Sequence, residues 1–71
     1  MNAPKIRFVS NIRKLRVKHG LSKQDLAKEL KTSMRQVYRW EDGTSLPTIQ
    51  HAVGMSRLFG VTIDQLVFGK M

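Results

Sequence analysis

The chain has 71 residues, a formal net charge of +8 and no cysteine. A chain this short forms one small domain that buries about 60% of its unfolded surface, and it contains neither a disulfide nor a thiolate zinc site. No apolar stretch approaches the roughly 20 residues of a membrane span, and the N-terminus has no signal-peptide core. We therefore expect a single cytoplasmic domain over residues 1–71, held together by packing and without a membrane partner.

The first predicted helix covers about residues 7–19. Its apolar residues recur on one side at helical spacing: Phe8 or Val9, Ile12 and Leu15. Most of its Lys and Arg residues fall on the other sides, and Gly20 suits the left-handed backbone that ends a helix. The segment is predicted to be an amphipathic helix with a basic outer surface.

The next stretch, residues 21–43, has the pattern of two short helices joined by a tight turn. Ser22 and Asp25 have the spacing of a capping box at the start of the first helix. Its inward side chains are Leu26, Ala27 and Leu30. Lys31 and Thr32 remain for the turn.

The second of these helices begins at another capping position. Ser33 is its N-cap, with Gln36 as the reciprocating residue of a capping box. Val37 and Trp40 share one face, and Gly43 supplies a left-handed stop. Trp40 is interpreted as a core residue, with stacking on nucleic acid as the alternative.

Two further helices complete the chain. Pro47 ends a loop, and Thr48 caps a fourth helix that runs to Phe59 and is closed by Gly60. Its apolar positions are Ile49, Ala52, Val53, Met55, Leu58 and Phe59. Gly54 within it predicts close packing against a neighbour. Thr62 and Gln65 form a capping box for a last helix with Ile63, Leu66, Val67 and Phe68. The predicted fold class is all-α, a compact bundle of about five short helices.

Charge is distributed unevenly along the chain. Residues 1–40 contain eleven Lys or Arg against two acidic residues, whereas residues 41–71 contain two against three. A concentrated positive surface attracts the phosphates of nucleic acid and gives salt-dependent affinity. The alternative is a solvated basic face that keeps a small domain soluble.

The segment 21–43 resembles the helix-turn-helix of the Cro and phage-repressor family, also called the XRE family. The residues that carry the resemblance are Leu21-Ser22, Leu26-Ala27, the polar run from Ser33, Val37, Glu41, Gly43 and Pro47. Arg16 stands where the family has an arginine, and residues 60–66 are similar to its closing helix. The resemblance covers about residues 8–68. It implies a lambda-repressor-like domain with a helix-turn-helix core at about 22–42, and binding to double-stranded DNA.

The outward residues of the helix that begins near Ser33 are predicted to read bases in the major groove. Arg35 and Arg39 carry planar guanidinium groups that fit the O6 and N7 acceptors of guanine. Met34 stands where the family often reads bases and suits a thymine methyl group. Tyr38 can stack on a sugar or bond a phosphate.

A second set of residues is predicted to contact the DNA backbone. By resemblance, Lys23 replaces a glutamine that touches the backbone or an outer base. Ser33, Gln36, Thr44 and Ser45 can donate hydrogen bonds to phosphate oxygens. For Ser33 and Gln36 the alternative role is helix capping alone. Lys31 replaces the glycine usual in the family's turn, so it either accepts a left-handed backbone or the turn differs.

Glu41 is predicted to have an internal role, because an acid at the end of a DNA-facing helix opposes both the phosphates and the helix dipole. In the family the matching glutamate pairs with the arginine that corresponds to Arg16. The resemblance therefore implies a partly buried ion pair between Arg16 and Glu41.

No catalytic, metal or cofactor site is predicted. His19 and His51 have no cysteine or paired acid at ligand spacing, and no phosphate loop or nucleophile elbow is present. We expect a DNA-binding protein without enzymatic activity.

The predicted function is that of a sequence-specific transcription regulator, with repression by promoter occupancy as the default implied by the resemblance. A homodimer on a palindromic operator, with half-sites about 34 Å apart, would supply affinity that one small domain lacks. Met55, Val67 and Phe68 are interface candidates or ordinary core residues. The length fits a complete short regulator or the DNA-binding part of a longer one. Two alternatives are an antitoxin that binds a toxin protein, and a basic module that binds membranes or RNA without sequence preference.

Overall fold

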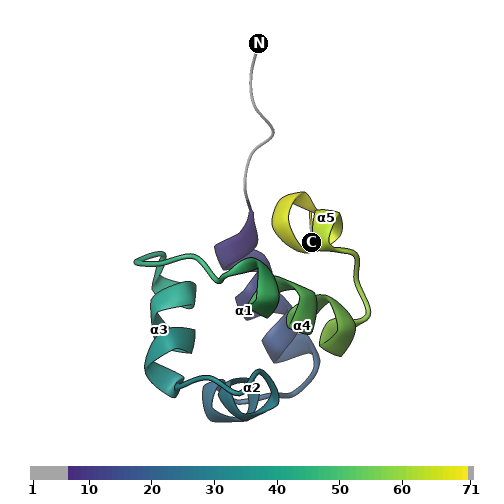
Figure 1. Ribbon diagram of the computed structural model, residues 1–71. Helices are drawn as coiled ribbons and strands as arrows, with labels where there is room; N and C mark the ends of the chain where they lie inside the picture. The colour runs from purple at the N-terminus through teal and green to yellow at the C-terminus, as the bar shows by residue number, and fades with distance from the viewer. Residues whose placement is uncertain (1–6, 71) are drawn as a thin grey trace.

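Residues 7–70, which the computed structural model describes, form five α-helices joined by short connections (Figure 1). The helices are α1 (Phe8–Lys18), α2 (Lys23–Glu29), α3 (Met34–Asp42), α4 (Ile49–Phe59) and α5 (Ile63–Phe68). No strand occurs in this part of the chain, which confirms the predicted all-α fold class. None of the helices within residues 7–70 combines the length and apolar character that crossing a membrane requires.

The helix starts follow the capping pattern of the sequence. The Ser22 hydroxyl accepts a hydrogen bond from the Asp25 N–H at 3.0 Å, and the Asp25 carboxylate accepts one from the Ser22 N–H at 3.0 Å. Thr62 and Gln65 form the same complete box at the start of α5. Each box satisfies two backbone donors that the first turn of a helix leaves without partners.

The capping box predicted at α3 is only half formed. The Ser33 hydroxyl accepts a hydrogen bond from the Gln36 N–H at 3.2 Å. The Gln36 side chain makes no return bond to the Ser33 backbone, so the predicted reciprocal role of Gln36 is wrong. Because Ser33 is exposed, its N–H is accessible to solvent and does not require the glutamine amide.

The core lies between the inner faces of the helices. Within residues 7–70 it contains eleven buried apolar side chains: Phe8, Ile12, Leu15, Leu26, Ala27, Val37, Trp40, Ala52, Met55, Phe59 and Leu66. Met55 is fully buried, so it cannot serve the dimer interface considered from the sequence. Val67 is partly buried against the core, whereas Phe68 is 38% exposed.

A buried polar residue joins the two ends of the described chain. The Asn11 side-chain amide, 1% exposed, donates hydrogen bonds to the carbonyl oxygens of Leu66 and Gly69, both at 2.9 Å. It thereby satisfies carbonyls at the C-terminal end of α5, which the helix itself leaves unpaired. Sequence reasoning missed Asn11, although its position one helical turn after Phe8 placed it on the inward side.

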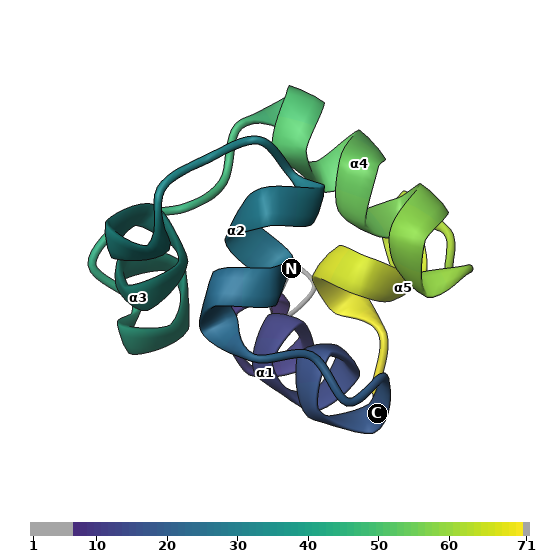
Figure 2. The same ribbon diagram turned by 90° about the horizontal axis from the view of Figure 1, so that it is seen from below.

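The arrangement of the helices leaves α3 at one side of the bundle. Figure 2 shows α3 on the opposite side from α5, with α1 and α2 between them. The turn between α2 and α3 contains Lys31 with φ of 55°, the left-handed conformation that glycine adopts more readily. Gly54 lies against α2, because an added Cβ would be 3.0 Å from Leu30 Cδ2, as the predicted close packing requires.

Candidate nucleic-acid interface

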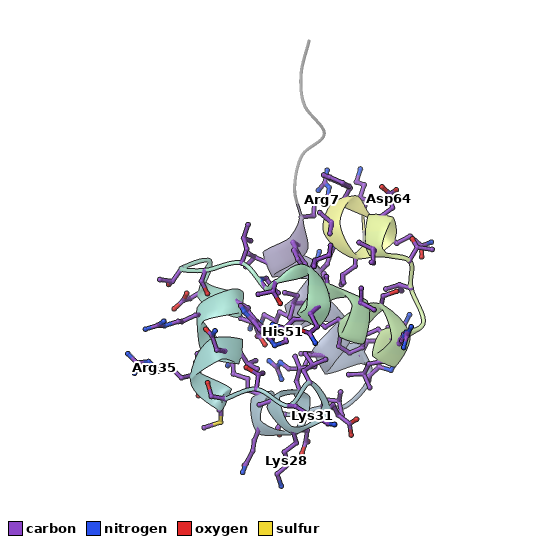
Figure 3. The ribbon with its side chains drawn as sticks, in the orientation of Figure 1. Arg7, Lys28, Lys31, Arg35, His51 and Asp64 are labelled. Carbon is purple, nitrogen blue, oxygen red and sulfur yellow. The ribbon has the colours of Figure 1, made fainter. Side chains whose placement is uncertain are left out.

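The outer face of α3 presents a mixed basic and aromatic surface. Arg35 and Arg39 are exposed, Tyr38 is 51% exposed and Met34 is 45% exposed. Arg35 points away from the body of the molecule (Figure 3). The structure thus brings all four predicted base-reading residues to one solvent-facing side of α3, while Val37 and Trp40 anchor its inner side in the core.

Neither Arg35 nor Arg39 has a hydrogen-bonding side-chain partner in the described part of the chain. Their guanidinium donors are therefore available to a ligand. An arginine that is exposed and uncommitted keeps the planar donor fork that pairs with guanine or with phosphate.

The start of α2 is joined to this surface by a contact that the sequence did not predict. The Lys23 ammonium lies 4.5 Å from the centroid of the Tyr38 ring, in a cation–π arrangement. Tyr38 therefore holds Lys23 in place, in addition to presenting its hydroxyl. Lys23, which is predicted to contact the DNA backbone, therefore lies directly beside the outer face of α3.

Arg16 and Glu41 form a two-point ion pair below that surface. Arg16 Nε donates to Glu41 Oε2 at 2.8 Å, and Nη2 donates to Oε1 at 3.1 Å. Arg16 Nη1 also donates to the Leu21 carbonyl oxygen at 2.8 Å. The two side chains are only 12% and 6% exposed. The pair joins α1 to α3 and to the connection before α2, so it fixes how α3 is presented.

The connection after α3 differs from the sequence prediction. The Thr44 hydroxyl and its N–H both donate to Asp42 Oδ1, and the N–H bond measures 2.8 Å. These two bonds lower the pKa of Asp42 below its ordinary value, and the hydroxyl bond has the largest effect. The nearby charge of Arg39 lowers the pKa further. The Thr44 donors are thus committed internally, and a phosphate contact by Thr44 requires their release.

The predicted phosphate contact by Ser45 would require its side chain to turn outward. Its hydroxyl oxygen is buried and has no hydrogen-bond partner. The Ser45 N–H bonds back to the Arg39 carbonyl oxygen at 3.3 Å, so the connection folds back on the end of α3. Ser33 remains exposed at the start of α3, and Gln36 is half-buried beside it.

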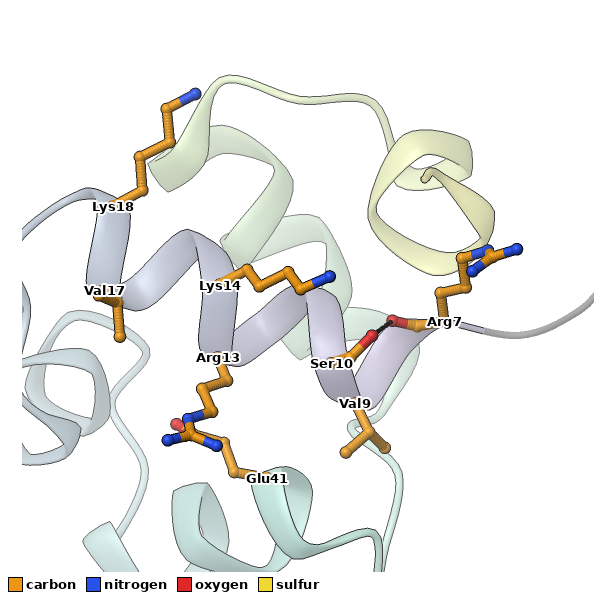
Figure 4. Close-up of a pocket in the computed structure, with 8 residues that line it drawn as sticks. All are labelled: Arg7, Val9, Ser10, Arg13, Lys14, Val17, Lys18 and Glu41. Carbon is orange, nitrogen blue, oxygen red and sulfur yellow. Dashed lines mark hydrogen bonds between the residues drawn. The ribbon is translucent and has the colours of Figure 1, made fainter. Parts of the chain in front are cut away.

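Two open hollows flank these elements. A groove of about 850 Å³ runs along α1 and is lined by Arg7, Val9, Ser10, Arg13, Lys14, Val17, Lys18 and Glu41 (Figure 4). A smaller hollow of about 270 Å³ is lined by Arg13, Lys23, Tyr38, Glu41 and Asp42. Arg13 belongs to both hollows. The sequence prediction did not single it out, although its position three residues before Arg16 placed it on the side of α1 that faces α3.

The two histidines pack against aromatic rings. The His19 and Phe59 ring centroids are 5.1 Å apart, and those of His51 and Trp40 are 5.0 Å apart. His51 Nδ1 also lies 3.0 Å from the Thr48 hydroxyl. Among residues 7–70 no cluster of three His, Asp or Glu side chains is placed to hold a metal ion.

The five-helix fold and the exposed α3 define a helix-turn-helix domain of the DNA-binding type. Residues 12–66 match a family model described as helix-turn-helix, and the chain belongs to the Cro/C1-type (XRE) helix-turn-helix family. This match confirms the family resemblance that the sequence indicated. The family consists of DNA-binding domains of transcription regulators, a class that is typically non-enzymatic.

Two individual proteins described as transcriptional regulators are also similar to this chain. The chain is 32% identical over 63 residues to the HTH-type transcriptional activator BcrR of Enterococcus faecalis. The aligned region covers 89% of this chain and 31% of that protein. A crystal structure of a transcriptional regulator from Listeria innocua superposes with a TM-score of 0.85 at 28% identity, covering 94% of this chain and 62% of that one. The chain thus spans about a third of the former and 62% of the latter.

Proposed function

We propose that this chain binds double-stranded DNA at a specific sequence, with α3 in the major groove, and represses transcription by occupying a promoter. The exposed, uncommitted pair Arg35 and Arg39 on the outer face of α3 is the observation that carries the proposal. A bidentate contact between arginine and guanine discriminates by about 1–3 kcal/mol against a wrong base. Met34, beside them, supplies an apolar surface for a thymine methyl group.

Contacts to the DNA backbone would come from the edges of this surface. Lys23 carries a charge held over the Tyr38 ring, and Ser33 is exposed at the start of α3. Gln36 is half-buried near Ser33, and its side-chain amide makes no hydrogen bond within residues 7–70, so it is a further candidate for a phosphate contact. These contacts would fix the register of α3 on the duplex without reading its sequence.

We further propose that the protein acts as a homodimer on a palindromic operator. Exposed apolar side chains suited to an interface occur at Leu46, Ile49 and Phe68, with exposed fractions of 59%, 74% and 38%. One recognition helix contacts few base pairs, so two copies on half-sites about 34 Å apart raise both affinity and specificity.

Selection from a random pool of duplexes at physiological salt tests the proposal. We expect enrichment of a palindromic site, protected from cleavage by two copies of the chain. Equal affinity for every duplex would refute sequence-specific binding and favour a nonspecific basic module.

A reporter assay tests the regulatory sign. With the selected site overlapping a promoter, we expect expression to fall when the protein is present. A similar protein is named as an activator, and a rise in expression here would refute repression while leaving DNA binding intact.

A further inference from the structure

Arg13 differs from the other cations on the outer side of α1 in the direction of its side chain. Figure 4 shows the Arg13 guanidinium reaching toward α3 and ending beside Glu41, whereas Lys14 extends sideways along α1 and Lys18 extends to the side opposite α3. Arg13 is exposed, so its charge remains accessible to a ligand. Arg13 is therefore an exposed α1 cation that faces α3, in addition to the buried Arg16.

Two carboxylates, Glu41 and Asp42, line the same hollow as Arg13, and each has another partner. Both oxygens of Glu41 accept hydrogen bonds from Arg16, at 2.8 and 3.1 Å. The Asp42 oxygen Oδ1 accepts the two bonds from Thr44. Within residues 7–70, Arg13 makes no hydrogen bond or salt bridge. Its guanidinium donors therefore remain available to a ligand.

Arg13 shares the hollow of about 270 Å³ with Lys23 and Tyr38. The Lys23 ammonium lies over the Tyr38 ring at 4.5 Å, so a second cation lines the same hollow. Tyr38 belongs to the outer face of α3, which connects the hollow to the proposed reading surface. The hollow thus has two cations beside the Tyr38 ring, and its two carboxylates are those already bonded to Arg16 and Thr44. Cations at the edge of a groove-reading helix match the edge of a major groove, where phosphates lie.

We propose that Arg13 and Lys23 together bind one phosphodiester group of the DNA backbone, so that α1 forms part of the DNA-contacting surface. The inference rests on the proposed function. The guanidinium fork fits two phosphate oxygens and the ammonium adds a point charge, which gives a contact independent of base identity. An anionic protein segment is the competing occupant, and the test below separates the two.

The test compares salt dependence for the full chain and its variants on the selected duplex and on a scrambled duplex. Arg13→Ala should weaken binding to both duplexes by the same factor, about fivefold near 150 mM salt, and lower the slope of log K against log salt by about 1. Arg57→Ala, an equal charge loss at an exposed α4 residue outside both hollows, should leave affinity and slope near those of the unsubstituted chain. Arg13→Lys should restore most of the slope.

A second comparison tests the shared phosphate. If Arg13 and Lys23 bind one group, the loss in the double Ala variant should be smaller than the product of the two single losses. The melting temperature should not change in Arg13→Ala, because the side chain makes no hydrogen bond or salt bridge. If that variant does unfold, Arg13→Lys and Arg13→Gln can be compared instead for the slope of log K against log salt.

The outcomes separate this inference from the function it rests on. If the unsubstituted chain selects no duplex sequence, both fail. If it selects one and Arg13→Ala behaves like Arg57→Ala, the phosphate site alone is refuted and the hollow is left to an anionic protein segment. Relaxed preference at a single base pair in Arg13→Ala would also refute it, since Arg13 would then read a base.

Discussion

Arginine has opposite roles in two regions of this molecule. At the junction of α1 and α3, Arg16 is 12% exposed and all of its bonding goes to Glu41 and the Leu21 carbonyl. On the outer face of α3, Arg35 and Arg39 are exposed and have no hydrogen-bonding side-chain partner in the described chain. The same side chain is therefore a structural joint in one place and a free set of donors in the other.

The difference shows what decides the role of a charged residue. A buried charge must be paired, because an unpaired buried charge costs several kcal/mol of folding free energy. Removing one partner of a buried pair is therefore destabilising, since the other charge stays buried without a partner. An exposed charge contributes little to folding and keeps its donors for a ligand. Substitutions at the junction should thus change stability, whereas substitutions on the reading face should change DNA binding.

The largest effect is expected at the junction. Glu41→Ala leaves Arg16 buried without its partner and should lower the free energy of unfolding by about 3–5 kcal/mol. Thermal melting measures the loss, with Glu29→Ala as the control because Glu29 is an exposed α2 glutamate. An unchanged melting temperature would show that the pair does not stabilise the fold.

The reading face should give the opposite result. Arg35→Ala and Arg39→Ala should each cost about 1–3 kcal/mol of discrimination at one base position, with melting temperatures close to that of the unsubstituted chain. Repeating the duplex selection with each variant identifies the relaxed position. If both variants retain the selected motif and only bind every duplex more weakly, neither arginine reads a base.

The turn between α2 and α3 links the two regions. Lys31 holds a left-handed backbone with φ of 55°, a conformation that costs a non-glycine residue about 1 kcal/mol. Lys31→Gly removes this strain, but the greater unfolded-state entropy of glycine offsets about 0.4–1 kcal/mol of it, so we expect a net stabilisation of at most about 0.5 kcal/mol. The control is Lys28→Gly, which places glycine inside α2 and should destabilise it. A loss of stability in Lys31→Gly would contradict the strain.

The smallest expected effect is on the stability of the fold at low pH. The hydrogen bonds from Thr44 lower the pKa of Asp42 in the folded state below the ordinary 3.8. Its stabilising contribution is therefore complete above that ordinary value and is lost as the pH falls through the lowered folded value. Denaturant midpoints measured during acidification should fall less in Asp42→Asn than in the unsubstituted chain. Asp64→Asn on α5 is the control, because Asp64 makes no side-chain hydrogen bond within residues 7–70. If the denaturant midpoints of all three proteins fall equally with pH, Asp42 has no role in acid stability.

The sequence by itself determined the helices and their ends. Caps such as Ser22 and Thr62, stops such as Gly43 and the apolar spacing of α3 act within a few residues, so neighbouring positions are enough to predict them. The pairing of Arg16 with Glu41 came from the family resemblance rather than from spacing. The outward position of Arg35 and Arg39 followed from helical geometry alone.

Only the tertiary structure decided which polar side chains meet partners far along the chain. Asn11 is buried and bonds the carbonyl oxygens of Leu66 and Gly69 because α5 returns to α1. Arg13 and Lys23 share a hollow because three helices converge there. Such contacts depend on how elements pack across long sequence separations, and local propensity carries no information about that packing.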